Sequence, residues 1–221
     1  MPDFKTFSSL LRITTKYEIP TIRSQLIEAI RDAYPETFEG LTPTKSIGEN
    51  AFDGPTPHPN EVLNLFVQQR LTSALPVAYY MAASRGLDSL MDRSLPQSAT
   101  LSPEILQSAI KMLMALRELE LNETYCLVLG SKPSHPCSWS NCPSRTTTGP
   151  RVSDAHKKVI GRITNSSRSG TKVLQVLSSS GICEGGSEEF CESCVKGWEA
   201  GHGEVRRRAW NTLPDVFGSE S

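Results

Sequence analysis

Apolar residues recur at intervals of three and four over residues 3–34, the spacing that places them on one face of a helix. Pro20 divides this segment, because proline suits the first turn of a helix, where its missing N–H costs nothing. Pro35 ends the second helix, since the residue before a proline is biased away from helical geometry. The pattern predicts a helical pair with two apolar stripes, one made of Phe4, Phe7, Leu10, Leu11 and Tyr17 and the other of Ile22, Leu26, Ile27 and Ile30.

Three further helices are expected after a connecting segment. Residues 36–59 are rich in proline and glycine and lack periodicity, which predicts an exposed linker. Asn60 is expected to cap the third helix, and a fourth opens at Leu75 and stops at Gly86. The fifth begins at Ser102, a capping hydroxyl followed by a proline and a glutamate that suit the first helical turn.

The whole pattern predicts a mainly α fold, a helical bundle followed by a C-terminal region of different composition. Residues 121–129 fit either a continuation of the fifth helix or a short strand. After Gly130 the chain becomes rich in serine, proline, threonine and glycine, which is typical of loops with short helices between them. The predicted organisation is a hairpin at 1–35, a linker at 36–59, a helical region at 60–130 and a cysteine-containing region at 131–221.

Composition places the chain among ordinary globular proteins. Of its 221 residues, 38% are hydrophobic and 21% charged, and the formal net charge is −1, which argues against a nucleic-acid clamp or an acidic tail. The N-terminus has no basic stretch followed by an apolar one, as a secretory signal would have. No apolar run approaches the roughly 20 residues that span a bilayer. We therefore expect an intracellular protein, cytoplasmic or nuclear, without membrane association.

Two cysteine pairs, far apart in the chain, carry the candidate chemistry. Four residues separate Cys137 from Cys142, and two separate Cys191 from Cys194. These spacings allow two thiolates of each pair to converge on one tetrahedral zinc ion, and a reducing compartment disfavours disulfides. Four thiolates leave no coordination position for water, so this zinc would be structural rather than catalytic. The metal would close the 48 residues of 143–190 into a loop.

Other roles for the cysteines stay open. The four could be inert buried thiols or could form disulfides in pairs. The spacing of Cys191 and Cys194 also occurs in thioredoxin-type redox pairs, although the βαβ context of such a pair is not apparent. Cys126 lies in an apolar stretch and is expected in the core. A zinc ligand could be replaced by Cys183, His135 or His202.

Motifs of catalysis do not accompany the cysteines. The sequence lacks a phosphate-binding loop, a glycine-rich dinucleotide fingerprint, a His-Glu-x-x-His pair and a Gly-x-Ser-x-Gly elbow. His58 and His156 have no acid and nucleophile grouped with them in the sequence, so we predict no enzymatic activity. The arginines at 206–208 are interpreted as the solvated face of a terminal helix rather than a phosphate-binding patch. Trp198 and Trp210 are expected in the core.

Several short motifs resemble, in their order, a large fungal family of BTB/POZ domain proteins. The first segment resembles the closing helical hairpin of the BTB domain and reads Phe7-x-x-Leu10-Leu11-Arg12-Ile13-x-x-Lys16-Tyr17-x-Ile19-x-x-Ile22-Arg23. A Leu-Pro-x-Ala-x-Tyr stretch at 75–80 is similar as well. The family also has similar spaced cysteine pairs and a similar C-terminal motif, which here reads Arg-x-x-x-Trp-x-x-Leu-Pro-x-x-Phe at 206–217.

The resemblance implies a protein–protein interaction or adaptor protein. BTB relatives dimerise through helices and an exchanged strand that precede this hairpin, and some serve ubiquitin ligases. The chain begins at the hairpin, so we expect residues 1–35 to be a BTB remnant that does not form the usual dimer and exposes part of its apolar stripes. The alternative is a zinc-containing, transcription-related protein that binds nucleic acid, whose affinity would fall steeply with salt.

Overall fold

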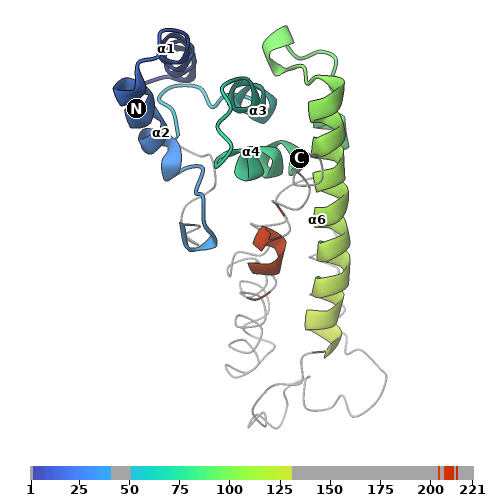
Figure 1. Cartoon of the computed structure of the whole chain (residues 1–221). Coiled ribbons are helices and arrows are strands. Elements are labelled where there is room, and N and C mark those ends of the chain that lie inside the picture. Colours follow the sequence, from blue (N-terminus) through green and yellow to red (C-terminus); the bar gives the residue numbers. More distant parts are fainter. Residues whose placement is uncertain (1, 41–50, 131–203, 205–206, 212, 214–221) are drawn as a thin grey trace. The chain divides into compact units, whose positions relative to one another are not determined.

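The computed structural model of the chain describes residues 2–40, 51–130, 204, 207–211 and 213, and these are mainly helical (Figure 1). The predicted mainly α fold is confirmed for this part of the chain. It contains no strand; Asp3 and Asp53 form an isolated parallel bridge. The chain divides into two compact units, Met1–Leu113 with Leu213–Ser221, and Met114–Thr212. The helical hairpin and the site described below lie in the first.

The predicted hairpin is confirmed as α1 (Phe4–Lys16) and α2 (Pro20–Arg31). Asp3 begins α1, because its carboxylate accepts a hydrogen bond of 2.8 Å from the Thr6 N–H. Pro20 occupies the start of α2, as the sequence predicts. The two helices pack against each other, and their most deeply buried side chains are Phe7, Leu11 and Ile30.

Two helices end in the same backbone motif. After α1, the Ile19 N–H donates to the Thr14 carbonyl at 2.9 Å, and Glu18 between them has a positive φ of 53°. After α3 (Pro59–Gln68), the Leu71 N–H donates to the Phe66 carbonyl at 3.0 Å, and Arg70 also has a φ of 53°. This six-to-one bond and left-handed residue define the Schellman motif, in which glycine is usual. Both positions therefore carry backbone strain.

Arg23 of α2 joins the two helix ends. Its guanidinium donates to the Gln69 carbonyl at the end of α3, at 2.9 Å, and lies 3.4 Å from the Thr15 hydroxyl near the end of α1. A cation at this place also complements the negative end of the α3 dipole. This one side chain thus ties both helices of the hairpin to α3.

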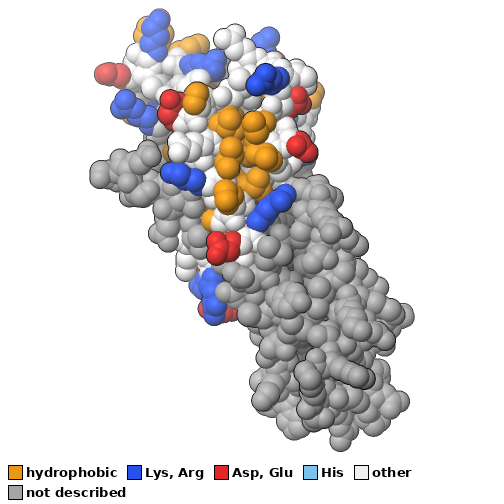
Figure 2. All heavy atoms as spheres, turned by 90° about the vertical axis from the view of Figure 1, so that its right-hand side faces the viewer, with side chains coloured by type: hydrophobic (Ala, Val, Ile, Leu, Met, Phe, Trp, Pro, Cys, Tyr) orange, Lys and Arg blue, Asp and Glu red, His pale blue; other side chains and the backbone are white. Residues whose placement is uncertain are grey.

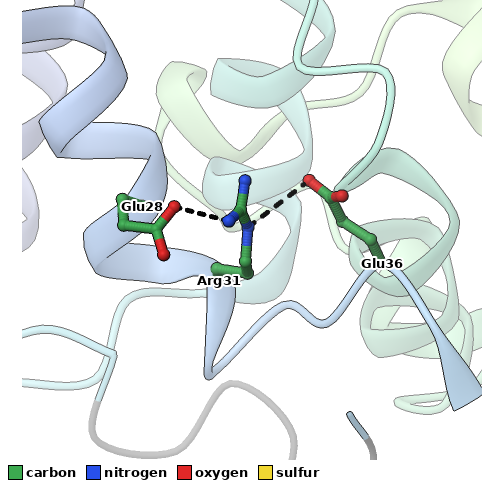
Figure 3. A network of polar contacts seen from close by, with 3 residues as sticks. All are labelled: Glu28, Arg31 and Glu36. Atoms are coloured by element: carbon green, nitrogen blue, oxygen red, sulfur yellow. Dashed lines mark ion pairs between the residues drawn. The ribbon is translucent and has the colours of Figure 1, made fainter. Parts of the chain in front are cut away.

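A second arginine fixes the other end of α2. Arg31 pairs with Glu28 one helical turn earlier, with 2.5 Å between the charged atoms, and reaches Glu36 beyond the helix at 3.8 Å (Figure 3). All three side chains are substantially exposed, so the network stabilises this corner only slightly. The short 3₁₀ helix η1 (Phe38–Gly40) follows.

The predicted linker at 36–59 is wrong in one respect: it is not exposed throughout. Phe52 is buried, and its ring centroid lies 5.1 Å from that of Phe4 and 5.2 Å from that of Phe7. Centroid distances of this size are typical of interacting aromatic rings. The segment after η1 thus contributes an aromatic side chain to the hairpin core. Residues 53–56 are exposed, as expected.

The predicted cap of the third helix is also wrong by two residues. α3 begins at Pro59, and the residue that caps it is His58, whose Nδ1 accepts a hydrogen bond of 3.2 Å from the Asn60 N–H. Asn60 is instead buried, and its Nδ2 donates to the Ser89 carbonyl at 3.4 Å. α3 is the central helix of the first unit, with Val62, Leu63, Leu65 and Phe66 buried and Val67 half-buried.

α4 (Leu75–Ala83) packs against α3 and begins where the sequence predicts. It ends three residues before Gly86, which has a φ of 84° and leads into the short helix α5 (Leu87–Leu90). A 3₁₀ helix, η2 (Gln97–Ala99), then contacts α3, where Asn64 donates to the carbonyls of Ser98 and Thr100.

α6 (Pro103–Gly130) begins at the predicted signal, with the Ser102 hydroxyl accepting from the Ile105 N–H at 3.4 Å. Its backbone is helical through 121–129, so the helical alternative for this stretch is correct. Further along, Arg207 and Arg208 are exposed on a helical segment, with Arg208 3.6 Å from Glu204. The exposure predicted for the arginines at 206–208 is thus observed for Arg207 and Arg208, whereas Arg206 lies outside the described residues. Trp210 is buried, as predicted, whereas Trp198 lies outside the described residues.

Candidate functional site

The four predicted zinc ligands, Cys137, Cys142, Cys191 and Cys194, lie outside the residues that the structure describes. The same holds for the replacement ligands Cys183, His135 and His202. Cys126 lies on the helical backbone of α6. Within the described ranges, no three His, Cys, Asp or Glu side chains are grouped so that they could hold a metal ion. The zinc site therefore remains a prediction from the cysteine spacing.

The hairpin exposes a set of apolar side chains that we call the hairpin face. Five of the eight exposed large hydrophobic residues among those described fall between positions 10 and 22, which is a concentration and not scatter. Their exposed fractions run from 36% to 65%. The hairpin face consists of Leu10, Ile13, Tyr17, Ile19 and Ile22.

The hairpin face corresponds only in part to the predicted exposed stripes. Leu10 and Ile22 are exposed as expected, but Phe7, Leu11 and Ile30 are among the most completely buried side chains. The reason is geometric: Leu10 and Leu11 are 100° apart around the helix, so only one of them can point into the core. α1 is apolar over more of its circumference than the core covers.

The charges of α1 are all basic. Lys5, Arg12 and Lys16 follow one another at seven- and four-residue steps, so they form a row along the helix, and α1 contains no acidic residue. The Lys16 Nζ lies 5.4 Å from the centroid of the Tyr17 ring, at the edge of the hairpin face. Positive charge thus lies directly beside the hairpin face at Tyr17.

A second apolar group lies away from the hairpin. Figure 2 shows hydrophobic side chains gathered on the side of the molecule where α6 lies in Figure 1, with charged side chains of both signs around them. Among the residues away from the hairpin, Leu87 of α5 is 44% exposed and Met91 directly after α5 is 54% exposed. These two residues provide a matched control for the hairpin face.

An open cavity of about 1330 Å³ lies beside the start of α3. Its lining includes Arg12, His58, Glu61 and Ser98, so it carries charges of both signs. The Ser98 hydroxyl donates a hydrogen bond to the Glu61 carboxylate across this cavity.

His58 is an ionisable group of this cavity whose two ring nitrogens both face polar partners. Its Nδ1 caps α3, and its Nε2 lies 3.4 Å from the Ser89 hydroxyl of α5. Burial lowers the pKa of His58, and the positive charge of Arg85 lowers it further. The carboxylates of Glu61 and Asp92 act in the opposite direction and do not reverse the shift. The ring is therefore held neutral as part of the structure.

Sequence reasoning did not assign His58 a role. The signal that points to it is Pro59, because proline at the first helical position marks the residue before it as the cap. Asn60, the predicted cap, has a buried Oδ1 without a hydrogen-bond partner among the described residues, and Gln69 has a buried Oε1 of the same kind.

Comparisons with models of protein families, with curated proteins and with solved structures found no match. The BTB/POZ resemblance rests on the sequence motifs quoted above. Among the described residues, no helix is long and apolar enough to cross a membrane.

Proposed function

We propose that this chain is a BTB-like protein–protein interaction or adaptor protein without catalytic activity, and that the hairpin face binds its partner. The observation that supports this is the concentration of exposed apolar residues in α1, in the turn that follows it and at the start of α2. Exposed apolar groups of this kind mark interaction sites, because covering them removes apolar surface from water, at roughly 25 cal/mol per Å².

The basic row of α1 defines what kind of partner fits. Lys5, Arg12 and Lys16 lie exposed along α1, the helix that carries Leu10 and Ile13 of the hairpin face. A partner surface with an apolar centre and acidic residues at its edge would match both features. A nucleic acid would match the charges but would leave the apolar residues uncovered, so a protein partner agrees better with the surface.

A structural zinc at Cys137, Cys142, Cys191 and Cys194 forms the second half of the proposal. Its support is the donor set itself: four thiolates at knuckle spacings favour zinc and leave no position for a reacting water. The metal would stabilise the C-terminal region and take no part in chemistry.

The experiment is quantitative affinity capture from native cell extract with the full chain. A triple variant, Leu10→Ser, Ile13→Ser and Ile22→Ser, removes three exposed apolar groups and leaves the buried core intact. The matched control is Leu87→Ser with Met91→Ser, which removes exposed apolar groups elsewhere. We expect the triple variant to lose protein partners that both wild type and control retain.

Two results would contradict the proposal. Retention of all partners by the triple variant would show that the hairpin face is not the binding surface. Capture dominated by nucleic acid, with affinity that falls steeply between low and moderate salt, would favour the alternative function.

A further inference from the structure

Three polar groups join α3 to α5 at a single place. His58 accepts the Asn60 N–H through Nδ1, and its Nε2 faces the Ser89 hydroxyl. Asn60 in turn donates from its side chain to the Ser89 carbonyl. α5 itself is a helix of four residues, in which the Leu90 and Met91 amides donate to the carbonyls of Gly86 and Leu87. It also packs against α4, with Leu90 buried. So short a helix depends on its tertiary contacts.

This arrangement requires a neutral imidazole. Because Nδ1 of His58 accepts the Asn60 N–H, the single proton of the neutral ring is on Nε2, where it can be donated to Ser89. A second proton would convert Nδ1 into a donor that opposes the Asn60 N–H. It would also place a positive charge at the positive end of the α3 dipole. His58 lines the open cavity, so water can deliver that proton.

We propose that neutral His58 is a latch that holds α5 against the start of α3, and that a proton on this ring releases α5. The charged groups that act on the ring come from each neighbouring segment: Arg85 before α5, Glu61 in α3 and Asp92 after α5. The apolar residues Leu87 and Met91 belong to the released segment, so acid would change the surface around them. This device is independent of the proposed hairpin partner.

The direction of the pH effect follows from proton binding. The unfolded chain protonates His58 near pH 6.5, whereas the folded chain does so at a lower pH, because the pKa of His58 is lowered. The stabilisation by neutral His58 is therefore complete above about pH 6.5. It decreases as the pH falls from there toward the folded-state pKa, and below that value it is lost.

The test is hydrogen exchange of the full chain at pH 7.5 and pH 5.0, with rates corrected for the chemical effect of pH. We expect the protection factors of the Leu90 and Met91 amides to fall several-fold at pH 5.0, while those of α1 stay unchanged. His58→Asn supplies a cap that does not titrate, so its protection factors should not depend on pH over this range. Ser89→Ala should lower the protection of α5 already at pH 7.5.

Protection of α5 that is independent of pH in the wild type would overturn the latch. So would a pH dependence that persists unchanged in His58→Asn. Should the variants fail to fold, the ring of His58 can be titrated by NMR in the wild-type chain. A midpoint below about 6.5, accompanied by shifts of the Asn60 and Ser89 resonances, supports the latch, and a midpoint at or above that value refutes it.

Discussion

At the scale of single residues, Arg23 has the most specific set of contacts in the hairpin. We predict that Arg23→Met lowers the free energy of unfolding by about 1–2 kcal/mol, because a charge-assisted hydrogen bond to the Gln69 carbonyl is lost while the apolar stem is kept. Urea denaturation monitored by circular dichroism measures this change. Loss of helix α3 amide protection should accompany it.

Arg12→Met is the matched control. The Arg12 side chain is exposed and makes no hydrogen bond or ion pair within the described part of the chain, so its replacement should change the free energy of unfolding by less than about 0.5 kcal/mol. Equal effects of the two substitutions would show that the guanidinium of Arg23 does not tie the hairpin to α3.

At the scale of whole elements, the end of α1 is not optimal. Glu18 occupies a left-handed conformation, which costs roughly 1–2 kcal/mol of folding free energy. Glycine would avoid that cost, but its greater freedom in the unfolded chain would destabilise the fold by roughly 0.5–1 kcal/mol. Glu18→Gly should therefore raise the free energy of unfolding by about 0.5–1 kcal/mol. Ala29→Gly, at an exposed position inside α2, should lower it by a similar amount. Destabilisation by both glycines would contradict this account.

The elements also show which features the sequence specifies locally. Pro20, Pro103 and the spacing of apolar residues locate α1, α2 and the start of α6 correctly, because these signals act within one or two turns of helix. The burial of Phe52 could not be predicted in the same way. It depends on contact with Phe4 and Phe7, which lie more than forty residues earlier, and the segment around it is rich in proline and glycine.

The candidate site was predictable to a similar extent. The sequence indicated that part of the hairpin stripes would be exposed, but the choice between Leu10 and Leu11 depends on which side of α1 the remaining core covers. The role of His58 depends on Ser89, some thirty residues later, and no local pattern reveals that contact. The cysteine pairs lie beyond the described residues, so their zinc remains a prediction from sequence alone.

At the scale of the whole molecule, the hairpin and the cysteine region should respond differently to metal removal. The proposed zinc closes residues 143–190 into a loop, and opening it would restore conformational freedom worth roughly 3 kcal/mol. The hairpin is held by apolar packing around Phe7 and Leu11 and by Arg23, none of which involves metal. Chelation followed by hydrogen exchange should therefore reduce protection over about 131–218 before it affects α1 and α2.

Metal analysis decides whether zinc is the cause of that difference. Chain purified without chelator should contain one zinc, and Cys191→Ser should lose it and reproduce the exchange pattern of the chelated wild type. Cys183→Ser is the matched control, because Cys183 lacks a closely spaced cysteine partner. This variant should keep the metal. Two results would contradict this division of the chain into a packed hairpin and a separately metal-stabilised region. One is zinc retained by Cys191→Ser, and the other is an equal loss of protection in the hairpin and the cysteine region.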